Sequence, residues 1–111
     1  MDNEKIIIDY KSLYQQHDNY IDNSISQERI LHKDIIRLVK NLQNNKNCKV
    51  EITGYSVEDR EISLISLGKG NLKVLAWSQM HGDEPTATAA LFDLLNFLLG
   101  NDHFNEIRDY I

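Results

Sequence analysis

The chain has 111 residues, the size of one compact domain that can bury roughly two-thirds of its unfolded surface. Its hydrophobic content of 41% and charged content of 26% exclude a disordered or fibrous class. The formal net charge is -5 and the Lys and Arg residues are scattered among acids, which excludes a nucleic-acid-binding surface. No nucleic-acid partner is therefore expected.

The beginning of the chain resembles neither a signal peptide nor a membrane anchor. Only Ile6, Ile7 and Ile8 follow the polar residues 1–5 before charge returns. No apolar run approaches the roughly 20 residues that a membrane helix requires. The sequence as given therefore predicts a cytoplasmic protein with no membrane partner.

The first apolar residues that recur at helical spacing lie between Lys5 and His17. They predict a short amphipathic helix, although the three adjacent isoleucines leave a strand open. Residues 1–25 are expected to form a helical extension that precedes the main α/β portion, residues 26–111. Together they make a single domain unit.

A second helix is predicted after the polar segment 18–26. Ser24 with Gln27 fits a capping box, and Ser26 is an equally good cap. A broad apolar stripe follows, made of Ile30, Leu31, Ile35, Leu38, Val39 and Leu42. The opposite face carries basic residues expected to face water, namely Arg29, Lys33, Arg37 and Lys40. The polar run 44–47 ends this helix.

The next two segments predict an antiparallel hairpin. Lys49–Val57 alternates with Val50 and Ile52 inward, until Gly54 interrupts the pattern and predicts a bulge. Glu61–Leu67 is the second strand, and the short polar connection 58–60 suits a hairpin. Cys48, the only cysteine, cannot form an internal disulfide and is expected to act as a small apolar residue near the strand start.

An almost wholly apolar stretch, Leu72–Trp77, predicts a third strand that is covered on both faces. Pro85 suits the first turn of a following helix that runs to about Leu99. Its inward face is expected to contain Ala87, Ala90, Leu91, Leu94, Leu95 and Leu98. Gly100 is expected to be the C-cap that ends this helix. Asp102 is expected to cap one further helix, which runs through Phe104, Ile107 and Tyr110. The fold class is therefore α/β, a partial mixed sheet of a hairpin and a third strand, flanked by helices.

The turn between the apolar stretch and this helix carries the best candidate for chemistry. His81 and Glu84 lie three residues apart, where both side chains can point to one side at metal-bonding distance. A hydrolytic zinc site needs three protein ligands and one open position for water. The pair alone is also explained by an ordinary loop histidine and a glutamate favoured by the helix dipole.

Two separate motifs make the chain, from about residue 26 to its end, resemble the amino-terminal portion of the metallocarboxypeptidase (M14) family of zinc carboxypeptidases. A family pattern on the first hairpin is matched by Gly54, Ser56, Glu58, Arg60 and Ile62. Asp59 stands where glycine is usual in that pattern. The family's first two zinc ligands lie in His-x-x-Glu, which falls on His81 and Glu84.

The resemblance implies one zinc ion, with a metal-activated water attacking a peptide bond of the substrate. It also implies that the third ligand, the substrate-binding groups and the catalytic glutamate lie beyond residue 111. Asp83 replaces the arginine of digestive members and favours bacterial types that act on cell-wall or other unusual peptides. Arg60 is expected to hold the hairpin, with a direct substrate role as the alternative.

The remaining residues near the candidate site or able to bind a metal are expected to have ordinary roles. His17, His32 and His103 are expected on the surface or in packing rather than as substitute ligands. Trp77 and Met80, beside the turn, are expected in the core.

Two hypotheses therefore stand. In the first, the chain is the opening part of a zinc carboxypeptidase domain, inactive alone and prone to self-association through an exposed sheet edge. In the second, it is a stand-alone small α/β module that binds a partner without catalysis. A natural reading frame that continues past Ile111 into a strand and another histidine would favour the first.

Overall fold

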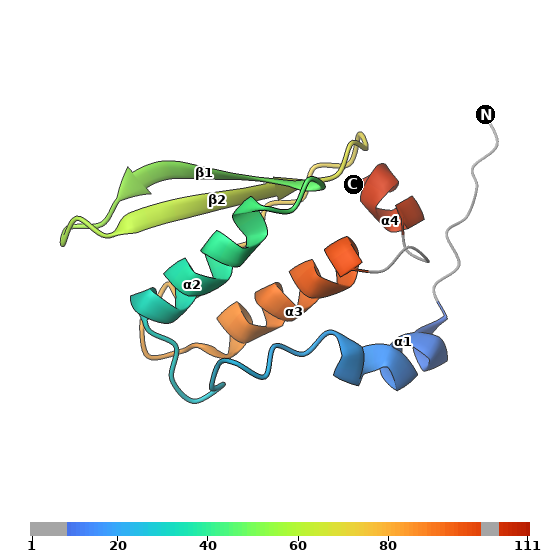
Figure 1. Ribbon diagram of the computed structural model, residues 1–111, viewed down its shortest axis with the longest axis horizontal. Helices are drawn as coiled ribbons and strands as arrows, with labels where there is room; N and C mark the ends of the chain where they lie inside the picture. Colours follow the sequence, from blue (N-terminus) through green and yellow to red (C-terminus); the bar gives the residue numbers. More distant parts are fainter. Residues whose placement is uncertain (1–8, 101–104) are drawn as a thin grey trace.

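The computed structural model describes residues 9–100 and 105–111. Figure 1 shows a β-hairpin above two helices that run side by side, with shorter helices near the two ends of the chain. In chain order the elements are α1 (Tyr10–Gln16), the 3-10 turn η1 (His17–Asn19), α2 (His32–Gln43), β1 (Cys48–Tyr55), β2 (Glu61–Leu67), α3 (Thr86–Gly100) and α4 (Asn105–Tyr110). The predicted α/β class is confirmed, with helices packed on one face of the hairpin.

The two strands form an antiparallel pair, as the sequence predicts. Cys48 lies opposite Leu67 and Tyr55 lies opposite Glu61, and the register shifts between Ile52 and Gly54. The shift is the bulge that Gly54 predicts. Ile52 was expected inward but is 51% exposed, directly before the register shift, where the bulge interrupts the inward alternation.

The core lies where α2, α3 and the hairpin meet. Leu38, Val39 and Phe92 form its buried cluster, and partly buried apolar residues pack around them, namely Ile25, Ile35, Leu42, Val50, Ile65 and Leu95. Each such side chain taken fully out of water contributes about 1.5–3 kcal/mol. The four basic side chains predicted to face water are exposed, three of them on α2 and Arg29 just before it.

The predicted start of α2 is wrong by several residues. Ser26 Oγ accepts a hydrogen bond from the backbone of Glu28, so this serine caps a local turn instead of a helix. The helix begins at His32, because the carboxylate of Asp34 accepts the backbone N–H of Leu31 at 2.9 Å.

The helix α1 covers part of the segment predicted near the start of the chain. Asp9 caps it by accepting from the backbone of Lys11 and Ser12. The predicted apolar face is largely exposed, with Tyr10 and Tyr14 at 77% and 85%. The isoleucine run and the positions predicted to lead into α4, Asp102, His103 and Phe104, lie outside the described residues.

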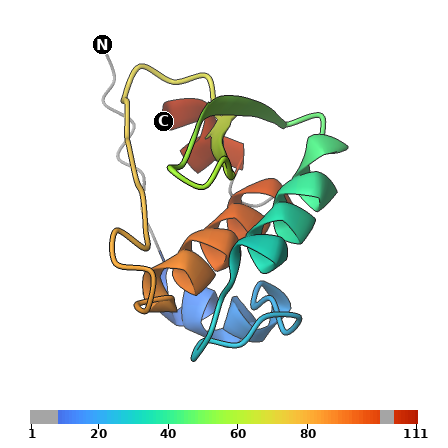
Figure 2. The ribbon, with the colours of Figure 1, turned by 90° about the vertical axis from the view of Figure 1, so that its left-hand side faces the viewer.

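The segment Leu72–Trp77 is not paired as a third strand, contrary to the prediction. Gly68, at φ 92°, turns the chain away after β2. Gly70 and Leu72 then donate backbone hydrogen bonds to the carbonyls of Ile111 and Tyr110. A Cβ at Gly70 would overlap the Tyr110 carbonyl, so this approach requires glycine. The backbone therefore meets the last residues instead of β2, and the segment runs separately along one side of the molecule (Figure 2).

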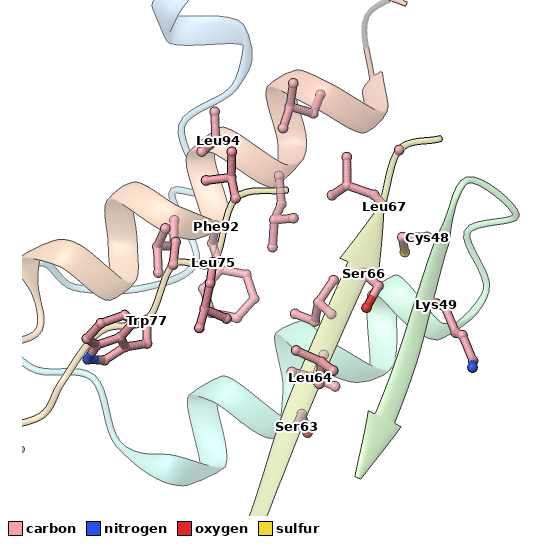
Figure 3. A pocket seen from close by; sticks show the side chains of 18 of the residues that line it. Cys48, Lys49, Ser63, Leu64, Ser66, Leu67, Leu75, Trp77, Phe92 and Leu94 are labelled. Atoms are coloured by element: carbon pink, nitrogen blue, oxygen red, sulfur yellow. The ribbon is translucent and has the colours of Figure 1, made fainter. Parts of the chain in front are cut away.

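The segment and the hairpin enclose an open apolar groove of about 1150 Å³. Figure 3 shows Leu75 and Phe92 on one side of this groove and Leu64 of β2 on the other. Val74, Leu75 and Trp77 are 65–75% exposed, so the expected cover on both faces is absent in the described part of the chain.

Within residues 9–100 and 105–111, no helix has the length and apolar character that a membrane crossing requires.

Helix α3 spans the predicted residues, but its buried face differs from the prediction. Thr88, Ala89, Phe92 and Leu98 are buried, whereas Ala87, Ala90 and Leu94 are exposed. The helix is apolar on nearly every side, so its periodicity does not select one face. Tertiary contacts select the buried face: Phe92 packs against Leu38 and Val39 of α2. On another side of the helix, Asp93 accepts from the backbone of Asp22, and Asn96 donates to the carbonyl of Tyr20.

Candidate metal centre

The candidate site is a tight turn that leads into α3. The backbone N–H of Glu84 donates to the carbonyl of His81 at 3.1 Å, which closes the turn around Gly82 and Asp83. Pro85 is buried directly after it, and its carbonyl accepts from Ala89 in the first turn of the helix. Proline at this position has no N–H to leave unpaired, so the local sequence favours a helix start here.

This turn brings the two predicted ligands together. His81 Nδ1 and Glu84 Oε2 lie 3.3 Å apart, and both side chains are about 70% exposed. The separation results from the turn, which places residues three apart on one side. Open access from solvent means that a metal ion and a substrate can both reach these atoms.

The donor atoms fit a zinc ion. Zinc is bound by imidazole nitrogen and carboxylate oxygen at about 2.0–2.2 Å, so neighbouring ligands of a tetrahedral ion lie about 3.3–3.6 Å apart. His81 Nδ1 and Glu84 Oε2 contact each other directly at 3.3 Å, as a hydrogen-bonded pair, and this separation is also compatible with that spacing. Among the residues that the structure describes, no group of three or more His, Cys, Asp or Glu side chains could hold a metal ion. The turn therefore offers two of the three ligands that a catalytic zinc needs.

The other described candidates do not join this pair. His17 is exposed beside Asp18, and the His32 ring nitrogen donates to the carbonyl of Glu61 at 3.0 Å. His103 lies outside the described residues. Cys48 donates its thiol to the carbonyl of Leu42, and burial raises the pKa of this thiol, which keeps it protonated and a poor metal ligand.

The hairpin motif forms a closed loop between β1 and β2. Ser56 and Arg60 exchange two hydrogen bonds: the Ser56 N–H donates to the Arg60 carbonyl at 2.8 Å, and the Arg60 N–H donates to Ser56 Oγ at 3.1 Å. The Arg60 guanidinium contacts Glu58 at 2.8 Å on the surface. Both hydrogen bonds use the backbone of Arg60, so they close the loop without requiring arginine, and the role of its side chain stays a prediction.

Sequence reasoning missed a polar cluster directly behind the turn. Gln79, Ser78 and Thr88 are joined by hydrogen bonds of 2.7 Å between their side chains. Thr88 is 4% exposed within an otherwise apolar helix face, a signal that a polar partner must lie nearby. By contrast, Trp77 and Met80 were expected in the core but are 65% and 72% exposed, because no further layer covers this side in the described residues.

Comparison with known proteins agrees with the geometry of the turn. Residues 35–111 match the family described as zinc carboxypeptidase, Peptidase M14. Neither the curated proteins nor the solved structures include a significant match to this chain. Because the family match covers well over half of the sequence and includes both motifs, the chain belongs to the zinc carboxypeptidase (M14) family.

Proposed function

We propose that this chain contributes His81 and Glu84 as two zinc ligands of an enzyme that hydrolyses peptide amide bonds. The observation that carries the proposal is the 3.3 Å separation of His81 Nδ1 and Glu84 Oε2 inside the matched family region. A neutral imidazole and a carboxylate form a ligand set typical of hydrolytic zinc. The third ligand and the general base come from outside the described residues.

The roles of the chain's own groups follow from their chemistry. Zinc, when bound, polarises a carbonyl and lowers the pKa of a bound water towards neutrality. His81 presents Nδ1, the nitrogen that faces Glu84, and Glu84 supplies negative charge that offsets part of the metal's charge. The exposed turn leaves room for a peptide carbonyl to approach from solvent.

Asp83 supports a substrate class other than that of digestive members. Its carboxylate is exposed beside Glu84, where the digestive members place a substrate-binding arginine. A negative charge there repels a peptide's terminal carboxylate instead of attracting it. Together with the resemblance to bacterial family members at this position, the change supports the proposal of a cell-wall or other unusual peptide as substrate.

The zinc assignment is tested by measuring zinc affinity of the natural protein with His81→Ala and Glu84→Gln variants. Each change is expected to weaken binding by more than the roughly 10–100-fold that loss of an outer supporting group causes. His17→Ala is the matched control, since His17 is an exposed histidine remote in sequence, and it should bind zinc as the native protein does.

Tight zinc binding that is unchanged in both ligand variants would refute the assignment. The alternative of a small binding module without catalysis would then be favoured.

A further inference from the structure

A polar cluster of Ser78, Gln79 and Thr88 lies behind residues 81–84, which we call the metal turn. In this cluster, the donor and the acceptor of each side-chain hydrogen bond can be assigned. Thr88 Oγ1 donates to Gln79 Oε1 at 2.7 Å, so the Ser78 hydroxyl must donate to Thr88 Oγ1, also at 2.7 Å. Each hydroxyl carries a single proton, which makes this direction unique. The buried Thr88 on α3 therefore fixes the carbonyl end of the Gln79 amide.

The other end of that amide is fixed as well. Gln79 Nε2 donates to the carbonyl of Ile30 at 3.1 Å and to the carbonyl of Gly82 at 3.0 Å. Ile30 is 3% exposed and lies just before α2, whereas Gly82 lies between the two proposed ligands. Through one side chain, the metal turn is thus attached to α3 and to the segment that precedes α2.

The backbone of Gln79 has an unfavourable conformation, which its side-chain hydrogen bonds must stabilise. Its φ is 51°, in the left-handed region that residues other than glycine rarely adopt. Such a conformation persists where surrounding contacts over-determine it, and these positions cluster at functional sites. Here the contacts are the hydrogen bonds of the Gln79 amide itself.

The geometry points to Gln79, supported by Thr88, as a positioning residue that orients His81 and Glu84 before a metal ion binds. Because the amide is hydrogen-bonded to the middle of the turn, it limits how far the two ligand side chains can separate. A turn that is already ordered loses less entropy on binding metal, which raises metal affinity. This inference rests on the zinc ligands proposed above.

The test compares zinc affinity across matched variants of the natural protein, by competition with a chromogenic chelator. Gln79→Met keeps the chain length but removes the amide, and Thr88→Val keeps the shape but removes the hydroxyl. Both are expected to weaken zinc binding about 10–100-fold. Thr88→Ser, which retains the hydroxyl, should restore nearly native affinity. Gln43→Met, the same change at an exposed site on α2, should have no effect.

Gln79→Gly separates positioning from a purely structural role. Glycine adopts the positive φ without steric cost, so relief of the backbone strain offsets part of the stability that is lost with the amide hydrogen bonds, and the cobalt spectrum reports the geometry of the metal site separately from stability. We expect its zinc affinity to fall as in Gln79→Met, and the visible absorption of its cobalt-substituted form to change in wavelength or intensity. Native zinc affinity and a native cobalt spectrum in Gln79→Gly would overturn the inference.

The His81→Ala and Glu84→Gln variants distinguish this failure from that of the proposed function. If they weaken zinc binding and the Gln79 variants do not, only the positioning role is wrong. If they too bind zinc as tightly as the native protein, the zinc assignment fails and the positioning role fails with it.

Discussion

Asp59 occupies the most strained position of the hairpin loop. Its φ is 55°, where the family pattern usually has glycine, and its N–H donates to the carbonyl of Ser56. Aspartate tolerates the left-handed region better than most residues but still has a Cβ that crowds the backbone. The loop therefore holds aspartate in a backbone conformation that suits glycine better.

Replacing Asp59 tests whether its left-handed conformation strains the loop. Asp59→Gly is expected to stabilise the chain by about 0.5–1 kcal/mol, because relief of the left-handed strain exceeds the extra entropy of the unfolded glycine. Asp59→Ala should destabilise it, because alanine has the Cβ without the local hydrogen bonding that helps aspartate. Urea denaturation midpoints measure both changes. A midpoint for Asp59→Gly below that of the native chain would show that the strain argument is wrong.

At the level of single residues, the sequence predicts contacts between residues close along the chain better than it predicts which side chains are buried. The spacing of His81 and Glu84 predicts that the side chains meet, and they lie 3.3 Å apart. Gln79 and Thr88 escape such reasoning, because their contact depends on a positive φ that the sequence does not reveal for glutamine. Burial of Trp77 was mispredicted because it depends on a covering layer that is not local.

The apolar side chains of the extended segment 72–77 are poorly covered by the rest of the described chain. Val74 and Leu75 are 69% and 75% exposed, and the described residues offer the segment no neighbouring strand. Unpaired extended backbone with apolar side chains favours pairing with another chain. We propose that the 111-residue chain associates with copies of itself through this segment.

Sedimentation velocity over a range of concentrations tests this proposal. The native chain should sediment faster as its concentration rises, and Val74→Lys should remain monomeric over the same range because a charge at the edge opposes pairing. Gln43→Lys adds the same charge on the exposed side of α2 and should behave as the native chain does. A native chain that is monomeric at every concentration would contradict the proposal.

Elements with a strong local signal are the ones that the sequence predicts well. The hairpin, the bulge at Gly54 and helix α3 follow from alternation, a glycine and a proline. The start of α2 was mispredicted because serine favours turns as well as helix caps: Ser24 donates to Asp22, and Ser26 accepts from the backbone of Glu28 in a local turn. The buried face of α3 was mispredicted because the helix is apolar on almost every side.

At the scale of the whole molecule, the family match and the core describe the same region. The matched residues, 35–111, run from the first turn of α2 to the last residue and contain most of the core around Phe92. The class and the order of the elements were predictable from the sequence, whereas the third strand was not observed. Its absence has a physical cause: residues 70–72 bond to Tyr110 and Ile111, so this part of the backbone turns away from β2.

We propose that His81 and Glu84 bind a catalytic zinc ion. Anomalous diffraction at the zinc absorption edge, from crystals of the zinc-loaded natural protein, tests it most directly. One strong peak is expected within about 2.0–2.2 Å of both His81 Nδ1 and a carboxylate oxygen of Glu84. A peak bound by other residues, with this turn free of metal, would contradict it.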